Sequence, residues 1–135
     1  MHIDKDLVAA SATPLVLGIL AEGESYGYAI AKRVAELSGG RMSWTDGMLY
    51  PLLHRLERHG LVEASWGRSG SGRRRKHYAL TPAGHEALAE RRRQWDVVAE
   101  TLGEVWRTLS AGAADAAGAA APRPAAGPAT AGGTA

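Results

Sequence analysis

Apolar residues recur every three or four positions in the first half of the chain, the spacing of helices that bury one face. The first such helix contains four of them, Leu15, Leu17, Ile19 and Leu20. Two starting points are compatible with the sequence. Thr13 is a suitable N-cap with Pro14 at the first helical position; alternatively, the helix begins near residue 5 and Pro14 kinks it.

A second helix is predicted after Ser25, a residue type that caps helix N-termini. Its apolar face contains Gly27, Ile30, Val34 and Leu37. The run Ser38, Gly39, Gly40 is expected to end it, because glycine favours the backbone conformation that closes a helix.

The third helix, from about Thr45 to His59, has the clearest division between its two faces. One face is a leucine stripe made of Leu49, Leu52, Leu53 and Leu56. The opposite face carries Gly47, Tyr50, Pro51, His54 and Arg58. Pro51 removes one backbone hydrogen bond, but Gly47 is the smallest neighbour its ring could meet, so we predict that the helix continues through Pro51 and that Gly60 closes it.

Residues 61–66 and 75–80 alternate between apolar and polar types, the period of a β-strand. The segment between them, residues 67–74, is rich in glycine, serine and arginine, which is typical of a hairpin loop. Thr81 and Pro82 then begin a last, long helix by the cap-then-proline pattern.

The order helix, helix, helix, hairpin, long helix is that of a winged helix-turn-helix protein. The predicted fold class is therefore mainly α with a small two-stranded β hairpin. We assign residues 1–80 to a winged DNA-binding domain, 81–109 to a dimerisation helix and 110–135 to a disordered tail, because the tail is almost entirely Ala, Gly and Pro.

The composition is that of an ordinary folded protein, with 45% apolar and 22% charged residues among 135. No cysteine is present, which excludes disulfides and thiolate metal sites. The longest apolar run, residues 14–21, is too short to span a bilayer. Asp4 and Asp6 beside a single Lys5 do not resemble an export signal, so we expect a cytoplasmic protein.

Positive charge is concentrated in one part of the chain. Ten Lys and Arg and four Asp and Glu lie between His54 and Arg93, a net charge of +6. A basic hairpin beside a helix that can enter a major groove favours double-stranded DNA over a merely solvated charge run. The candidate DNA-binding residues are Ser43, Thr45, Asp46, Tyr50, His54, Arg55, Arg58, Arg73, Arg74, Arg75 and Lys76.

The roles of some candidates stay open. Ser43 and Thr45 either cap the third helix or contact DNA. Tyr50 suits a phosphate oxygen better than a base edge. Arg55 and Arg58 either read guanine or contact phosphates.

No enzymatic or metal site is predicted. His54, Glu57 and His59 have the spacing of a short metal motif, but two positions five apart on a helix differ by about 140° in azimuth, so the histidines cannot share an ion. The chain contains no recognisable nucleophile motif or phosphate loop. We therefore expect no cofactor and no catalysis.

The last helix carries apolar residues spaced as in a coiled coil, which a small domain cannot cover alone, so a homodimer is predicted. These interface residues are Leu88, Trp95, Val98, Leu102, Val105, Trp106 and Leu109. Trp106 is interpreted as interface filling, whereas Trp95 could also stack on a flat aromatic ligand between subunits.

Several motifs occur in an order that resembles the PadR family of transcriptional regulators. They are Leu17-Gly18-Ile19-Leu20, Tyr26-Gly27-Tyr28, Gly47-Met48-Leu49-Tyr50-Pro51, Leu56-Glu57, Gly60-Leu61-Val62, Gly72-Arg73-Arg74-Arg75-Lys76-His77-Tyr78, and Leu80-Thr81 with Gly84. The resemblance covers residues 13 to about 109 and is to the compact subgroup with one C-terminal helix. It implies a homodimeric repressor of a palindromic operator that a small aromatic ligand releases.

In drug-responding members of that subgroup, a tryptophan about fourteen residues after the Leu-Thr pair forms part of a stacking platform. Trp95 stands at this distance from Thr81. The resemblance thus implies a ligand site at Trp95, Val98 and Ala99 between two subunits, although the neighbouring residues differ in type. The alternative function is a winged-helix protein-interaction module without specific DNA reading; four consecutive basic residues on the hairpin speak against it.

Overall fold

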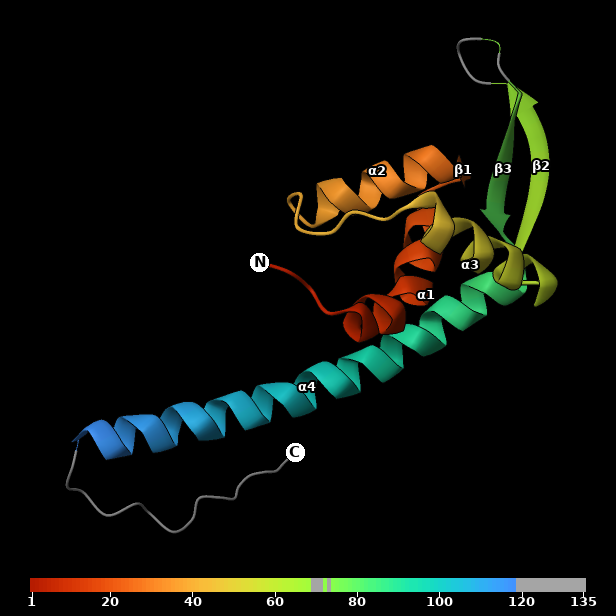
Figure 1. Ribbon diagram of the computed structural model, residues 1–135. Helices are drawn as coiled ribbons and strands as arrows, with labels where there is room; N and C mark the ends of the chain where they lie inside the picture. The colour runs from red at the N-terminus through yellow and green to blue at the C-terminus, as the bar shows by residue number, and fades with distance from the viewer. Residues whose placement is uncertain (69–71, 73, 119–135) are drawn as a thin grey trace. The chain divides into compact units, whose positions relative to one another are not determined.

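The computed structural model describes residues 1–68, 72 and 74–118 (Figure 1). Within these residues the chain forms four helices and three strands. They divide into two compact units, the first of Met1–Gln94 and the second starting at Trp95. The mainly helical class with a small antiparallel sheet is confirmed.

Helix α1 (Lys5–Ala21) takes the earlier of the two predicted starts, so Pro14 lies inside it and Thr13 is not its N-cap. Asp4 occupies the cap position. The apolar residues that α1 buries in the core are Ala12, Val16, Leu17, Ile19 and Leu20. The longer helix is favoured because residues before Pro14 contribute Ala12 to this core, and Val8 packs against it.

The prediction that Ser25 caps the second helix is wrong. Ser25 and Tyr26 form a short strand, β1 (Ser25–Tyr26), and helix α2 (Gly27–Leu37) begins one residue later. Strand β1 pairs antiparallel with the third strand, with Ser25 opposite Tyr78 and Tyr26 opposite His77. The backbone groups before α2 therefore find partners in a distant strand, which no local pattern reveals.

Helix α3 (Asp46–Arg58) agrees with the prediction. Thr45 caps it, its Oγ1 accepting a hydrogen bond of 3.3 Å from the backbone N–H of Met48. The helix continues through Pro51, and the four residues of the leucine stripe, Leu49, Leu52, Leu53 and Leu56, are buried. The opposite face of α3 is consequently turned away from the core.

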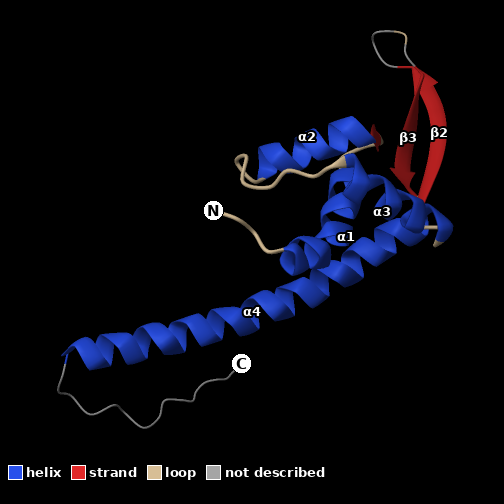
Figure 2. Ribbon diagram, in the orientation of Figure 1, coloured by secondary structure: helices blue, strands red, loops and turns tan. Residues whose placement is uncertain are grey.

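Strands β2 (Val62–Arg68) and β3 (Arg74–Leu80) form the predicted hairpin, and β1 joins β3 to give the order β1-β3-β2 (Figure 2). Val62 lies opposite Leu80 and Trp66 opposite Lys76. Helix α1 packs against β3 and α3 against β2. The sheet is thus a three-stranded extension of the helical core rather than an isolated hairpin, whose two strands alone would be marginally stable.

The core fills the space between α1, α2, α3 and the base of the hairpin. Its most deeply buried side chains are Tyr78, Leu17, Ile30, Leu49, Leu53, Val16 and Val34. Burial raises the pKa of the Tyr78 hydroxyl above its ordinary value, so this group stays protonated and neutral in the core.

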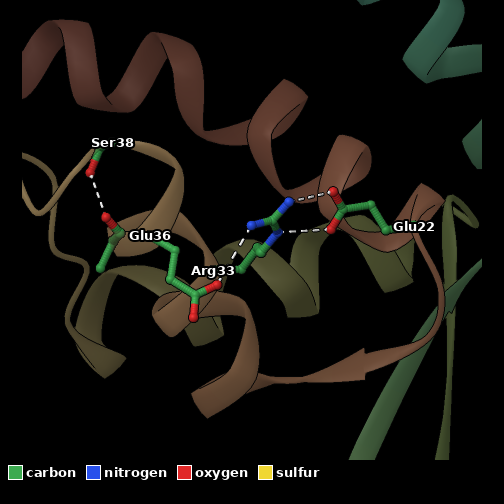
Figure 3. A network of polar contacts seen from close by, with 5 residues as sticks. Glu22, Arg33, Glu36 and Ser38 are labelled. Carbon is green, nitrogen blue, oxygen red and sulfur yellow. Dashed lines mark hydrogen bonds and ion pairs between the residues drawn. The ribbon is translucent and has the colours of Figure 1, made fainter.

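Arg33 ties α2 to the end of α1. Its Nε and Nη2 donate to the two carboxylate oxygens of Glu22 at 3.1 and 3.0 Å, and Nη1 lies 3.5 Å from Glu36 (Figure 3). Ser38 ends α2 by donating to the carbonyl of Ala35 at 3.2 Å and accepting from the N–H of Met42 at 2.9 Å. These contacts fix α2 against the end of α1 and close its C-terminus.

Helix α4 (Pro82–Gly118) starts on the turn that links α3 to β2. The Thr81 hydroxyl donates to the carbonyl of Gly60 at 2.6 Å and accepts from the N–H of Gly84 at 3.0 Å, and the N–H of Thr81 donates to the carbonyl of Leu61 at 3.1 Å. Gly84 lies so close to this turn that a Cβ there would be 2.0 Å from the Leu61 oxygen. The Thr81–Gly84 motif thereby joins the hairpin, α3 and α4.

The helix continues past its predicted end at Leu109, to Gly118. Residues 110–118, assigned above to a disordered tail, are therefore helical. Their alanine content explains the correction, because alanine has the highest intrinsic helix propensity. Residues 119–135, the rest of that predicted tail, lie outside the described residues.

Candidate functional site

The outward face of α3 presents polar and basic side chains to solvent. Because the leucine stripe faces the core, the side chains on the remaining face are free to contact a partner. The predicted DNA-contact residues in and just before α3 are all exposed: Ser43, Thr45, Asp46, Tyr50, His54, Arg55 and Arg58. Of the open alternatives, capping is settled for Thr45, whose hydroxyl accepts from Met48.

The hairpin places an aromatic ring and two cations on one face of the sheet. Trp66 lies directly opposite Lys76, and Arg74, two residues before Lys76 in the sequence, is on the same face. The Arg74 guanidinium carbon lies 4.8 Å from the centre of the Trp66 ring, a cation–π arrangement. Trp66 remains 61% exposed, so a large apolar surface stands in solvent beside a positive charge.

The other face of the hairpin holds Arg75. Its guanidinium carbon lies 4.5 Å from the centre of the Tyr26 ring, and Tyr26 in turn lies 5.3 Å from the His77 ring. The Nε of Arg75 is buried and has no hydrogen-bond partner within the described chain. Strand β1 therefore orients Arg75, the third arginine of the basic run, through an aromatic side chain.

Lys76 is engaged within the protein itself. Its Nζ lies 3.5 Å from a carboxylate oxygen of Glu57 on α3 and 5.6 Å from the centre of the Tyr78 ring. This ion pair links the hairpin to α3 and neutralises one of the charges that the sequence assigned to DNA. The pairing was missed because Glu57 and Lys76 are distant in sequence.

The Tyr50 ring lies against the start of α2, at a position where Gly27 has no side chain. A Cβ at Gly27 would be 2.3 Å from the Tyr50 hydroxyl oxygen, so only glycine leaves room for the ring there. The Tyr50 and His54 rings lie 6.4 Å apart on α3. The Tyr-Gly-Tyr motif of residues 26–28 thus positions the tyrosine of α3.

These side chains surround one hollow, which we name the wing groove. It has a volume of about 320 Å³ and lies between the start of α2, the middle of α3 and the hairpin. Its lining residues are Tyr26, Gly27, Tyr28, Tyr50, His54, Trp66, Arg74, Arg75, Lys76 and Tyr78. The groove is therefore aromatic and basic, a combination suited to an anionic polymer with apolar faces.

The wing groove gathers five of the predicted DNA-contact residues, Tyr50, His54, Arg74, Arg75 and Lys76. Arg55 and Arg58 are exposed on α3 but do not line it, and Arg73 lies outside the described residues. Sequence reasoning missed Tyr26, Tyr28 and Trp66. The available signal for Trp66 was an aromatic residue in a strand next to a polar loop, and it was interpreted only as strand alternation.

The second unit presents the predicted dimer face. Five of its apolar side chains are 44–61% exposed: Val98, Leu102, Val105, Trp106 and Leu109. Ala99 is also exposed, and Trp95 is partly buried. Leu88 differs from the expectation, because it belongs to the first unit and packs partly buried against the core of the winged domain.

The fold and this surface define a class of protein. A helix-turn-helix with an exposed second helix, followed by a hairpin with arginines at its outer end, is the architecture of a winged-helix DNA-binding regulator. None of the described helices is both long enough and apolar enough to cross a membrane.

Comparison with known proteins identifies the family. Residues 16–90 match the Transcriptional regulator PadR-like family, so the chain belongs to it. The transcriptional regulator Rv3488 of Mycobacterium tuberculosis is 48% identical over 69 residues, which are 50% of this chain and 64% of that protein. An uncharacterised protein of Lysinibacillus sphaericus is 26% identical over 100 residues, 74% of this chain and 92% of that protein.

Solved structures agree with this family. A PadR family transcriptional regulator from Eggerthella lenta superposes with a TM-score of 0.66 at 35% identity, covering 76% of this chain and 88% of the other. A PadR-like transcriptional regulator from Bacillus cereus gives a TM-score of 0.67 at 26% identity, covering 76% and 97%. The family and its structures are transcriptional regulators and not enzymes, as the sequence predicted.

Proposed function

We propose that the chain is a homodimeric repressor that binds a palindromic operator. The observation that carries the DNA contact is the meeting of α3's outward face with the basic hairpin around the wing groove. In this proposal α3 enters the major groove and the hairpin contacts phosphates of the flanking backbone. Arg58 and Arg55 contact DNA from the part of α3 outside the groove.

The test is fluorescence anisotropy with a duplex from the region upstream of the protein's own gene and a scrambled duplex, each at two salt concentrations. Sequence-preferring binding that weakens steeply with salt supports the proposal. Replacing Arg74 and Arg75 by alanine should reduce both affinity and salt dependence. If neither these duplexes nor a random-sequence selection gives preferred binding, the interaction-module function replaces it.

Dimerisation is supported by the exposed apolar residues of the second unit, which recur at three and four positions. Two copies would cover each other's seam and hold two α3 helices for two half-sites. Leu102→Asp should convert the dimer to a monomer in analytical ultracentrifugation. Val97→Asp is the matched control, because Val97 is 61% exposed but lies off the seam. A dimer that survives Leu102→Asp would contradict this interface.

Ligand release is proposed at Trp95, Val98 and Ala99. The partly buried Trp95 borders the exposed Val98 and Ala99, so a second subunit would create an aromatic-lined space around them. A planar acridine dye should quench tryptophan emission in the wild type and much less in Trp95→Ala. Trp106→Ala serves as the control. Equal quenching in wild type and Trp95→Ala would remove this site.

A further inference from the structure

We infer that the wing groove holds one strand of the DNA backbone and that Trp66 contacts that strand directly. This inference rests on the proposed DNA-binding function and assigns a residue and a type of contact to it. A DNA strand alternates anionic phosphates with the apolar faces of its sugars. The groove offers cations and aromatic rings side by side, which is the complementary pattern.

The exposure of the aromatic side chains supports this assignment. Trp66 and Tyr28 are 61% and 65% exposed, yet both line the same hollow. Both rings leave most of their surface in solvent, Trp66 even with Arg74 over its ring, although most large apolar side chains of the winged domain are buried. Packing against deoxyribose would remove their apolar surface from water, which is favourable.

The cations around Trp66 are arranged for a phosphate. Arg74 lies over the indole ring, and a guanidinium stacked on an aromatic face keeps its N–H donors for a second partner. Lys76 is paired with Glu57, so Arg74 is the free cation nearest to Trp66 among the described groove residues. The Trp66–Arg74 pair thus presents an apolar surface to a sugar and hydrogen-bond donors to the adjacent phosphate.

Tyr50 completes the opposite wall. Gly27 leaves room for the Tyr50 ring at the start of α2. The Tyr50 hydroxyl is a donor of the kind that binds phosphate oxygens. His54 follows one turn later on α3. The groove therefore contacts the strand from α3 and from the hairpin at once, which fixes the angle between α3 and the duplex.

The salt dependence of binding tests the two members of the pair separately. Trp66→Ala should weaken binding about tenfold with no change in the slope of log K against log salt, because a sugar contact releases no counterion. Arg74→Ala should also weaken binding and lower the slope by about 1, because it loses a phosphate contact.

Tryptophan emission gives a readout independent of affinity. Adding the duplex should change the emission of the wild type, and this change should be largely lost in Trp66→Phe. Trp106→Phe is the matched control, since Trp106 is 57% exposed and lies in the second unit. Thermal unfolding of Trp66→Ala should match that of the wild type, because the ring is mostly exposed.

The outcomes separate this inference from the proposed function. If the wild type binds no DNA, the proposed function fails and the inference fails with it. If the wild type binds DNA but Trp66→Ala leaves affinity unchanged, or the duplex changes emission equally in Trp66→Phe, only the groove assignment is overturned. If the acridine dye binds at Trp66 and the dye-saturated protein still binds DNA with unchanged affinity, the groove is instead a site for a small planar molecule.

Discussion

Glu57 of α3 and Lys76 of β3 form an ion pair, with 3.5 Å between the carboxylate oxygen and Nζ. The pair ties the hairpin to α3, and it offsets a positive charge within the candidate interface. Both side chains keep roughly a third of their surface in solvent, at 39% and 32%, so the pair contributes little to stability.

Glu57→Gln should therefore tighten DNA binding. The substitution releases Lys76 for a phosphate and removes a negative charge near the strand, so affinity should rise about two- to fivefold. The slope of log K against log salt should steepen by about 1. Anisotropy titrations at several salt concentrations measure both. Glu63→Gln on β2 removes the same charge without breaking the Glu57–Lys76 pair, and an equal gain in affinity from it would show that the effect is only general electrostatics.

Gly27→Ala should weaken DNA binding because it displaces Tyr50. The added Cβ would be 2.3 Å from the Tyr50 hydroxyl oxygen, and the end of this exposed side chain can move at small cost. Binding should fall while the melting temperature changes little. In a Tyr50→Ala background the same substitution has no ring to displace, so it should leave binding unaffected and, through helix propensity, raise stability slightly. Equal losses of DNA affinity in both backgrounds would refute the coupling between Gly27 and Tyr50.

Gly84→Ala should destabilise the winged domain strongly. The new Cβ would lie 2.0 Å from the Leu61 carbonyl oxygen, which is backbone and held by the N–H of Thr81. We expect a loss of about 1–3 kcal/mol in urea unfolding, the usual cost of overpacking. Gly18→Ala is the contrasting control: nothing lies within 4 Å of its added Cβ, and it should gain about 0.5–1 kcal/mol. Changes of the same sign in the free energy of unfolding of both variants would argue against this packing.

The Glu22–Arg33 pair should give a pH-dependent contribution to stability. The hydrogen bond from Arg33 lowers the pKa of Glu22 in the folded protein. A carboxyl group with a lowered folded pKa stabilises the protein above its unfolded pKa, and this contribution is lost as the pH falls through the folded pKa. Wild type should thus be more stable than Glu22→Gln near neutral pH, and the difference should vanish in acid.

Urea unfolding at about pH 7 and about pH 3 measures this difference. Because Glu22 is exposed, the effect at neutral pH should be small. Glu24→Gln removes the same charge two residues away and provides the control. A difference between wild type and Glu22→Gln that persists undiminished in acid would contradict the assignment.

Much of the winged domain follows from local sequence. The leucine stripe of α3 specifies which face is buried, and with it the outward position of Tyr50, His54 and Arg58, because helix geometry alone relates these positions. Alternation and a glycine-rich loop likewise located the hairpin. Thr45 and Thr81 were recognisable as caps because a hydroxyl before a helix satisfies free N–H groups of its first turn.

The tertiary structure decided which of these elements meet. Strand β1, the Glu57–Lys76 pair, the approach of Tyr50 to Gly27 and the stacking of Arg74 on Trp66 all join side chains or backbones through space. Residue patterns report the environment of a position within its own helix or strand, but not the register between elements. The sequence by itself therefore determined the fold class and the family of this protein, whereas packing between α2, α3 and the hairpin created the wing groove.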